Sequence, residues 1–419
     1  MKTKYLLLAV AALGGLFTAV RPAFAQNWTL SDAPTEFWQA VASSADGSHL
    51  VAVAIEDPSI GPCDCLEGTI YTSIDSGATW ALTSAPLAEW MSVASSADGS
   101  KLVAVSRDLN FGLGYNPGLI YTSTDSGATW TATSAPSTDW TAVASSADGT
   151  KLVAADGGNA PIYTSSDSGA TWRATSAPHI SWSSLASSAD GAHLLAAGVV
   201  VPGDPFPPYG LIYTSTDSGA TWTLTSAPTD DSWLSVASSA DGSKLAAVGE
   251  YWYGFAKAIP VYTSSNSGTT WTAANMPITN CVCVACSADG SKLVAGTDGG
   301  PIYTSTDSGA TWTPSNAPSG RWYAVASSAD GSKLVAGGYP DGIYTWQSTT
   351  APLLSMSFSG GNVVISWPAP PINFVLQQNP DLTTTNWTDV VTAPTVTNLQ
   401  NQVVLPAPPG NAFYRLMSR

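Results

Sequence analysis

The sequence predicts an all-β protein: a seven-bladed β-propeller closed by an N-terminal strand, followed by a small β-sandwich-like domain. Three observations predict this fold. Seven repeats, each marked by an Ala-Asp-Gly turn, follow one another at spacings of 41 to 52 residues, each repeat contains four short strand-like segments, and the two ends of the repeat array complement each other. Four antiparallel strands repeated at this period are typical of a propeller.

One full repeat reads W-x-x-V-A-S-S-A-D-G-S-K-L-V-A, then a variable loop, then I-Y-T-S-x-D-S-G-A-T-W-T-x-T-S-A-P. We name its strands A (VASS), B (KLVA), C (IYTS) and D (TWTxTS). The Asp-Gly pair between A and B favours a tight hairpin, because Gly readily adopts a positive φ. The small Ala and Ser residues of strand A suit the crowded axis at which seven sheets would converge.

The two ends of the repeat array predict how the ring closes. Residues 27–34 match strand D alone, whereas the last repeat has strands A, B and C at 323–328, 333–338 and 342–346 but lacks strand D. We therefore expect the N-terminal strand to complete the last blade. A closed ring of seven blades leaves no sheet edge open to other chains.

The chain divides into three segments by composition. Residues 1–25 have a basic start, an apolar stretch and the small-residue site Ala23-Phe24-Ala25, which indicates a secretory signal peptide. Residues 26–350 form the predicted propeller. Residues 351–419 carry alternating apolar segments between Gly, Pro and Asn turns and form the predicted sandwich-like domain. We expect a secreted or cell-envelope protein.

The charge of the chain restricts its partners. The chain is 44% hydrophobic and 11% charged with a net charge of −16, and loss of the signal peptide would leave 11 basic and 30 acidic residues. Such a surface repels nucleic acid and anionic lipid head groups. We expect a monomer with no nucleic-acid partner and no membrane span after signal cleavage.

The pattern S-x-D-x-G-x-T-W recurs six times and ends at Trp80, Trp130, Trp172, Trp222, Trp271 and Trp312. The chain resembles the Asp-box, or BNR, repeat of sialidase-like propellers over roughly residues 27–348. We interpret the boxes as structural turns, because a short polar side chain bonds backbone N–H groups two residues on and Gly supplies a positive φ. Asn266 could not serve as a carboxylate acid or base. The structural box residues are Asp75, Asp125, Asp167, Asp217, Asn266 and Asp307.

The resemblance to sialidases implies a triad of arginines that grips a substrate carboxylate. The predicted propeller has only Arg107, Arg173 and Arg321, and Arg173 lies on an outer strand. We therefore expect a non-catalytic protein. The alternative is a glycoside hydrolase of the sialidase-like or xyloglucanase-like type, which needs two loop carboxylates. Photosystem assembly factors also use such propellers, but a basic patch like theirs is not visible in this sequence.

The B-to-C loops are the predicted binding site. They are long in blades 1, 2, 4 and 5, at 55–68, 106–118, 198–210 and 249–258, and variable loops on a rigid scaffold tend to carry function. Aromatic faces beside carboxylates suit a glycan or an extracellular protein. The alternative is that the aromatics pack their own loops. The predicted ligand-binding residues are Phe111, Tyr115, Phe206, Tyr209, Glu250, Tyr251, Trp252 and Tyr253.

Two further sets of residues have open interpretations. A tryptophan begins strand A in six blades, and these residues form either a stacking platform around the channel or wedges between blades. They are Trp38, Trp90, Trp140, Trp182, Trp233 and Trp322. The five cysteines permit a short-range disulfide or one between the two clusters. We expect no metal and no cofactor, because zinc sites use a wider cysteine spacing and His is scarce.

Overall fold

A computed structural model describes residues 9–11, 27–55, 68–107, 118–200, 209–229, 232–250, 260–274, 276, 280–339 and 342–348, and shorter pieces of 354–418. The chain forms two compact units. One unit spans Asn27–Gln347, and the other contains Met1–Gln26 and Ser348–Arg419.

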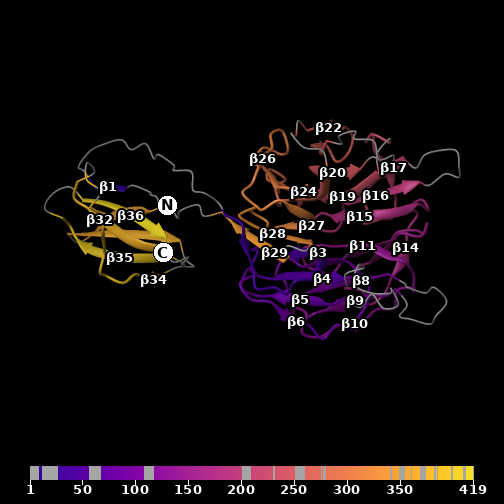
Figure 1. Ribbon diagram of the computed structural model, residues 1–419, viewed down its shortest axis with the longest axis horizontal. Coiled ribbons are helices and arrows are strands. Elements are labelled where there is room, and N and C mark those ends of the chain that lie inside the picture. Colours follow the sequence, from indigo (N-terminus) through magenta and orange to yellow (C-terminus); the bar gives the residue numbers. More distant parts are fainter. Residues whose placement is uncertain are drawn as a thin grey trace. The chain divides into compact units, whose positions relative to one another are not determined.

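The unit Asn27–Gln347 is a β-propeller whose described strands form seven antiparallel blades of four strands each (Figure 1). In blades 1 to 4 the strands A to D are β3 (Phe37–Ser43), β4 (Leu50–Ile55), β5 (Ile70–Ser73) and β6 (Ala81–Leu82); β7 (Trp90–Ser95), β8 (Leu102–Ser106), β9 (Ile120–Ser123) and β10 (Thr131–Ala132); β11 (Trp140–Ser145), β12 (Leu152–Asp156), β13 (Tyr163–Ser165) and β14 (Arg173–Ala174); and β15 (Ser181–Ser187), β16 (Leu194–Val200), β17 (Tyr209–Ser215) and β18 (Thr223–Leu224).

Blades 5 to 7 follow the same order of strands. They are β19 (Ser232–Ser238), β20 (Leu245–Glu250), β21 (Tyr262–Ser264) and β22 (Thr272–Ala273); β23 (Cys281–Cys286), β24 (Leu293–Gly300), β25 (Tyr303–Ser305) and β26 (Thr313–Pro314); and β27 (Gly320–Ser327), β28 (Lys333–Tyr339), β29 (Gly342–Gln347) and β2 (Thr29–Leu30). Strand β24 also pairs with β27, so blades 6 and 7 share one sheet.

The N-terminal strand closes the ring, as the ends of the repeat array predict. In β2, Thr29 and Leu30 pair with Thr345 and Tyr344 of β29. The indole of Trp28 is 8% exposed, and its Nε1 donates to Ser315 Oγ of blade 6 at 2.9 Å. The predicted all-β fold with a seven-bladed, strand-closed propeller is therefore confirmed.

A second ring of contacts closes the propeller at the A-to-B turns. In each blade the alanine of the Ala-Asp-Gly turn donates its N–H to the equivalent carbonyl of the next blade, at 2.7 or 2.8 Å. The last of these donors bonds back to the first blade. The seven residues are Ala45, Ala97, Ala147, Ala189, Ala240, Ala288 and Ala329. This closed circle of backbone bonds holds strands A together at one end of the axis.

The strand-A tryptophans wedge between neighbouring blades. All six are at most 1% exposed, and Trp38 of blade 1 shares a core cluster with Ala324, Val335 and Ile343 of blade 7. Trp38 also meets Tyr71 of its own blade edge-on, with ring centroids 5.6 Å apart. Burial of this degree excludes the stacking platform, because no face of these rings is open to a ligand.

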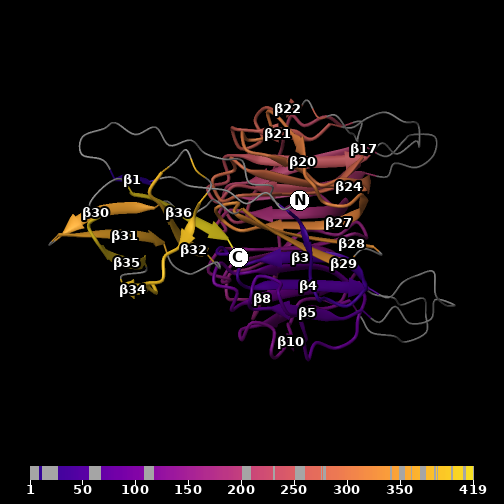
Figure 2. The same cartoon turned by 60° about the vertical axis from the view of Figure 1, so that its left-hand side comes forward.

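The second unit is a small two-sheet domain (Figure 2). One sheet has the order β30 (Ser355–Ser359), β31 (Asn362–Pro368), β35 (Gln400–Pro406) and β34 (Thr395–Thr397). The other has the order β1 (Ala9–Ala11), β36 (Ala412–Ser418), β32 (Phe374–Asn379) and β33 (Thr388–Asp389). Its buried core contains Val363, Ile365, Trp367, Leu376, Val403, Ala412 and Tyr414.

Strand β1 lies within the segment that the sequence predicts to be a signal peptide, and its cleavage stays a prediction. In the part of the chain that the structure describes, no helix has the length and apolar character needed to span a membrane.

Candidate functional site

The Asp boxes form the C-to-D turns, and Asp125 shows their geometry. Its Oδ1 accepts bonds from Ser123 Oγ and Thr129 N–H, both at 2.8 Å, and its Oδ2 accepts one from Thr129 Oγ1 at 2.7 Å. Ser126 and Gly127 adopt φ values of 57° and 89°. The carboxylate thus bonds the backbone four residues on. The expected bond two residues on is wrong for the box, because two residues in the left-handed region turn the chain before Thr129 N–H reaches the carboxylate.

In several blades the box tryptophan and a box serine tie the turn to its surroundings. Trp130 Nε1 donates to Gly127 O at 3.1 Å and so folds back over its own turn. Lys101 Nζ of blade 2 donates to the box residue Ser168 of blade 3 at 3.3 Å, and Lys151 repeats this contact with Ser218 of blade 4. These contacts join neighbouring blades.

The fifth box works without a carboxylate. Asn266 Oδ1 accepts the bond from Thr270 N–H at 2.9 Å, which reproduces the bond made by Asp125. The hydrogen-bond acceptor, and not the negative charge, is the feature that all six boxes share.

We predict that acid weakens the fold through these turns and the Asp-Gly turns. In the A-to-B turns, hydrogen bonds from neighbouring serine and threonine residues lower the pKa of Asp98, Asp148 and Asp241 to about 2. A lowered pKa stabilises the fold above the ordinary value of 3.8, and that stability is lost as the pH falls through the folded-state pKa. Thermal melts should show a nearly constant midpoint from pH 7 to pH 5 and a falling midpoint between pH 4 and pH 2. A midpoint that is constant down to pH 2 would contradict this assignment.

Most of the predicted ligand-binding residues lie outside the described part of the chain. They are Phe111, Tyr115, Phe206, Tyr251, Trp252 and Tyr253. Tyr209 begins β17, pairs with Val200 and is 39% exposed. The backbone of Glu250 ends β20, where it pairs with Ser232. The loop site therefore stays a prediction.

A cavity of about 720 Å³ lies on the propeller axis, since residues from strand A of every blade line it. Each strand A contains a β-bulge directly after its tryptophan, or after Cys281 in blade 6, which leaves one residue without a partner on strand B. All seven unpaired residues line the cavity, and we call them the bulge ring. They are Gln39, Met91, Thr141, Ser183, Leu234, Val282 and Tyr323.

The bulge ring varies where the rest of strand A repeats. No two of its seven side chains are the same, whereas the residue two positions further on is Val in six blades and Leu185 in the other. A β-bulge re-aims a side chain and recurs next to active sites. Two ring hydroxyls also serve the scaffold, because Thr141 and Ser183 donate to the carbonyls of Trp182 and Trp233 in the next blades.

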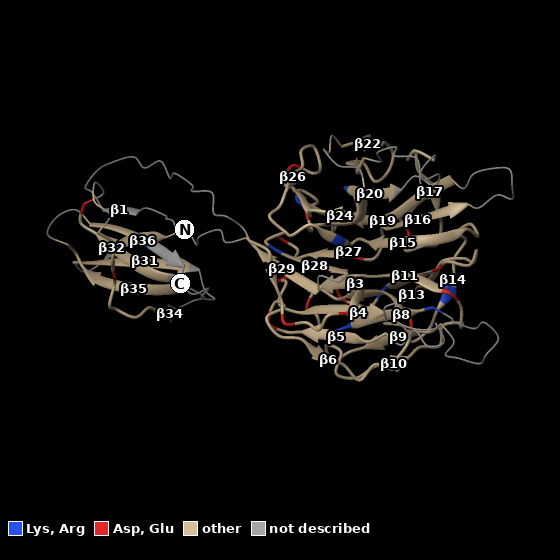
Figure 3. Ribbon diagram, in the orientation of Figure 1, with Lys and Arg blue, Asp and Glu red and all other residues tan. Residues whose placement is uncertain are grey.

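Charged residues gather at the end of the cavity where strands A begin and strands B end, which we call the loop face. In blades 2 and 3 they are Glu89, Arg107 and Asp139, with Arg107 Nη1 3.6 Å from Glu89 Oε1. Burial raises the pKa of Glu89; the Arg107 charge opposes this rise and the Asp139 charge adds to it. Figure 3 marks Lys and Arg in blue and Asp and Glu in red, and shows that most of the described ribbon carries neither charge.

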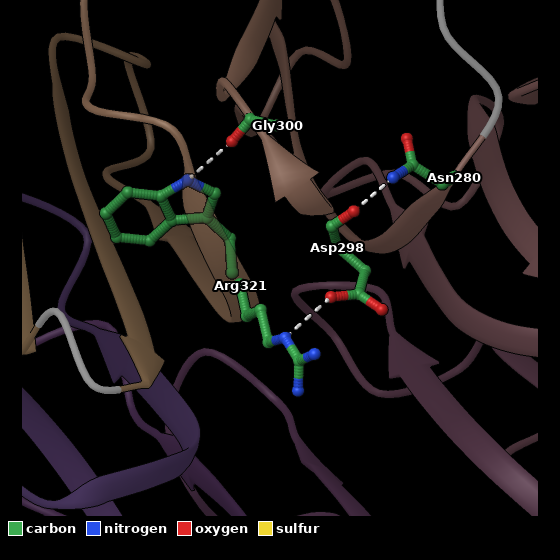
Figure 4. Close-up of polar contacts among 5 residues, drawn as sticks. Asn280, Asp298, Gly300 and Arg321 are labelled. Carbon is green, nitrogen blue, oxygen red and sulfur yellow. Dashed lines mark hydrogen bonds and ion pairs between the residues drawn. The ribbon is translucent and has the colours of Figure 1, made fainter.

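A second polar group lies between blades 6 and 7 on the same face (Figure 4). Arg321 Nε lies 3.4 Å from Asp298 Oδ1, and Asn280 Nδ2 donates to the carbonyl of Asp298. The side chains of Arg321 and Asp298 are 62% and 50% exposed, so this ion pair is open to solvent and to ligands.

Aromatic side chains extend this group into blade 1. Phe37 stacks on Tyr323 and on Tyr339, with ring centroids 5.1 Å apart in both pairs. Tyr323 belongs to the bulge ring, and Tyr339 pairs with Arg321 across β27 and β28. The loop face is therefore acidic on the side of blades 2 and 3, and carries an ion pair beside aromatic rings where blades 6, 7 and 1 meet.

Sequence reasoning missed the bulge ring and its charged rim. The signal was present in the repeats: the positions directly before and after the strand-A tryptophan vary, although the tryptophan itself recurs. The arginines lie as the sequence indicates, because Arg173 is on the outer strand β14 whereas Arg107 and Arg321 are at the loop face. Of the cysteines, Cys281, Cys283 and Cys286 have free thiols, and Cys63 and Cys65 lie outside the described residues. The described residues contain no cluster of three metal-ligating side chains.

Comparison with known proteins agrees with the fold. No family model and no curated protein matches the sequence. Among solved structures, the chain is similar to YCF48 from Cyanidioschyzon merolae, with a TM-score of 0.54, 14% identity, and coverage of 77% of this chain and 98% of that chain. It is also similar to YCF48 bound to D1 peptide, with a TM-score of 0.54, 16% identity, and coverage of 79% and 100%. At these identities the likeness shows a shared propeller fold.

Proposed function

We propose that this chain is an exported, non-catalytic propeller of the Asp-box type that binds a segment of another protein at the loop face. One observation carries the proposal: the bulge ring differs in every blade, while the residues around it repeat. Residues that only hold blades together have no physical reason to differ from one blade to the next. A varied ring on a repeated scaffold is therefore the part of the axis that is fitted to a partner.

The chemistry of the ring suits a peptide segment. The ring combines apolar residues such as Met91 and Leu234 with polar residues such as Gln39. A cavity of about 720 Å³ falls within the range of ligand sites, which combine apolar walls with a few placed polar groups. The Phe37 ring stacks on two tyrosine rings, so its faces are less available to sugars than the faces of isolated aromatics.

Two further points support the proposal. A propeller of similar fold, YCF48, has been solved with a D1 peptide bound. In addition, strands B end on the loop face, so the long B-to-C loops predicted from the sequence to bind ligands start beside the rim of the cavity. We place the partner's contacts on both the loops and the bulge ring.

We predict that truncating the ring weakens binding. Wild-type protein screened against a displayed peptide library and a glycan array should select peptides. A Met91→Ala, Leu234→Ala double variant should bind the selected peptides at least about tenfold more weakly, since buried interface side chains are worth about 1–2 kcal/mol each. The affinities are measured by calorimetry.

The matched control is a Leu82→Ala, Leu224→Ala double variant. These two leucines lie on the outer strands β6 and β18 and are 61% and 50% exposed, so the same side chains are lost far from the axis. Equal affinities of the two double variants would contradict the proposed site. Selection of glycans alone, or turnover of a polysaccharide, would contradict the proposed function.

A further inference from the structure

Glu89 is a buried carboxylate with one unused oxygen. It lies directly before β7 and is 6% exposed. Its Oε1 faces Arg107 at 3.6 Å, but its Oε2 has no hydrogen-bond partner among the described residues. A buried acceptor without a partner is uncommon in folded proteins, because it loses its bonds to water without gaining others.

Glu89 does not itself line the cavity, but its position in the repeat places it beside residues that do. Asp139 and Ser181 occupy the equivalent position in the next two blades, and both line the cavity. Arg107, the ion-pair partner of Glu89, lines it as well. The acidic group of blades 2 and 3 therefore lies at the mouth of the proposed binding site.

We propose that Glu89, together with Asp139, forms a seat for a cationic Lys or Arg side chain of the bound protein segment. The inference rests on the proposed function and adds the charge that the partner must carry. The two carboxylates outnumber the one guanidinium, so the seat has a net negative charge. Oε2 has almost no accessible surface in the unbound protein. A Lys ammonium or an Arg guanidinium would therefore displace the partly exposed Arg107 side chain, donate to Oε2 and supply the missing bond.

The alternative is that Glu89 only stabilises the fold by pairing with Arg107. The geometry favours the seat over this alternative. The Arg107 side chain is 40% exposed and approaches only Oε1, at a distance longer than a hydrogen bond. A pair that holds the fold together would be expected to use both oxygens, as the Asp boxes do with their own donors.

The test uses the full chain and capped peptides selected in the library screen, each paired with a version in which every Lys or Arg is replaced by neutral norleucine. Wild-type protein should bind the charged versions at least about tenfold more tightly. In Glu89→Gln this preference should disappear, whereas it should persist in Asp32→Asn, which removes the same charge from an exposed site on the outer part of blade 7. Arg107→Gln removes the competing cation and should strengthen the binding of charged peptides.

Stability and pH separate the seat from a structural ion pair. Because burial raises the pKa of Glu89, folding disfavours its charged form at neutral pH, so Glu89→Gln without peptide should melt at the same temperature as wild type or higher. Binding of charged peptides by wild type should strengthen as the pH rises through that raised pKa. Glu89→Gln should lack this dependence, because the group whose pKa is raised is gone. The other charged groups that face the site, Arg107 and Asp139, are the same in both proteins.

The outcomes distinguish the two proposals. If wild type selects no peptide, the proposed function fails and the seat fails with it. If peptides bind equally well with norleucine, or if Glu89→Gln keeps the preference for charge, only the seat is overturned. A Glu89→Gln variant that melts well below wild type at neutral pH would also overturn it in favour of the structural pair.

Discussion

Deletion of residues 27–34 should lower the melting temperature of the propeller by about 10 °C or more. The deletion removes β2, which is the only described strand that covers the outer edge of β29. It also removes the buried indole of Trp28 and its bond to Ser315. Burial of a tryptophan alone is worth about 3–5 kcal/mol, and the uncovered edge of blade 7 would be open to pairing with other chains.

The matched control is a chain that begins at Asn27 and therefore keeps β2. Calorimetry should give this control the full melting temperature of the propeller, and the deletion variant a lower one together with concentration-dependent aggregation. If the two chains melt together, ring closure by β2 contributes little, and the account of blade 7 is wrong.

Replacement of a wedge tryptophan should have a comparable effect. Trp233 is fully buried, meets Tyr262 edge-on with centroids 5.6 Å apart, and packs against Leu195 and Ile212 of the preceding blade. Trp233→Ala should destabilise the protein by about 3–5 kcal/mol, because it opens a cavity between two blades that the surrounding sheets cannot fill.

Chemical denaturation gives the measurement for Trp233→Ala. The control is Leu224→Ala on the exposed outer strand of the same pair of blades, which should stay within about 0.5 kcal/mol of wild type. A Trp233→Ala variant as stable as the control would mean that the tryptophan is not a wedge. In that case its ring would have to be available for other contacts.

The repeats made the scaffold predictable from the sequence. The Asp-Gly turns, the IYTS strands and the missing last strand D fix which segments pair, because each signal is local and occurs many times. Blade 6 shows the limit of this reasoning. Cys281 stands where the other blades have tryptophan, and its thiol lies 3.6 Å from the sulfur of Met276. Cys281 packs against Met276 in one core cluster where the other blades have an indole, which a repeat pattern alone does not reveal.

The site was less predictable, for two physical reasons. The residue after each strand-A tryptophan is turned toward the axis by a β-bulge, and the alternation of strand residues does not predict a bulge. The burial of Glu89 depends on contacts between segments that are separate in the sequence. An acidic residue before a buried tryptophan otherwise resembles an ordinary exposed charge.

Hydrogen–deuterium exchange with a selected peptide tests most directly whether the varied positions, and not the repeated ones, make up the binding surface. We expect peptide-dependent protection to concentrate at the bulge ring and in the segments directly before it, in strands β3, β7, β11, β15, β19, β23 and β27, with unchanged exchange in the Asp-box turns. Protection centred on those turns, or confined to the C-terminal domain, would contradict the account.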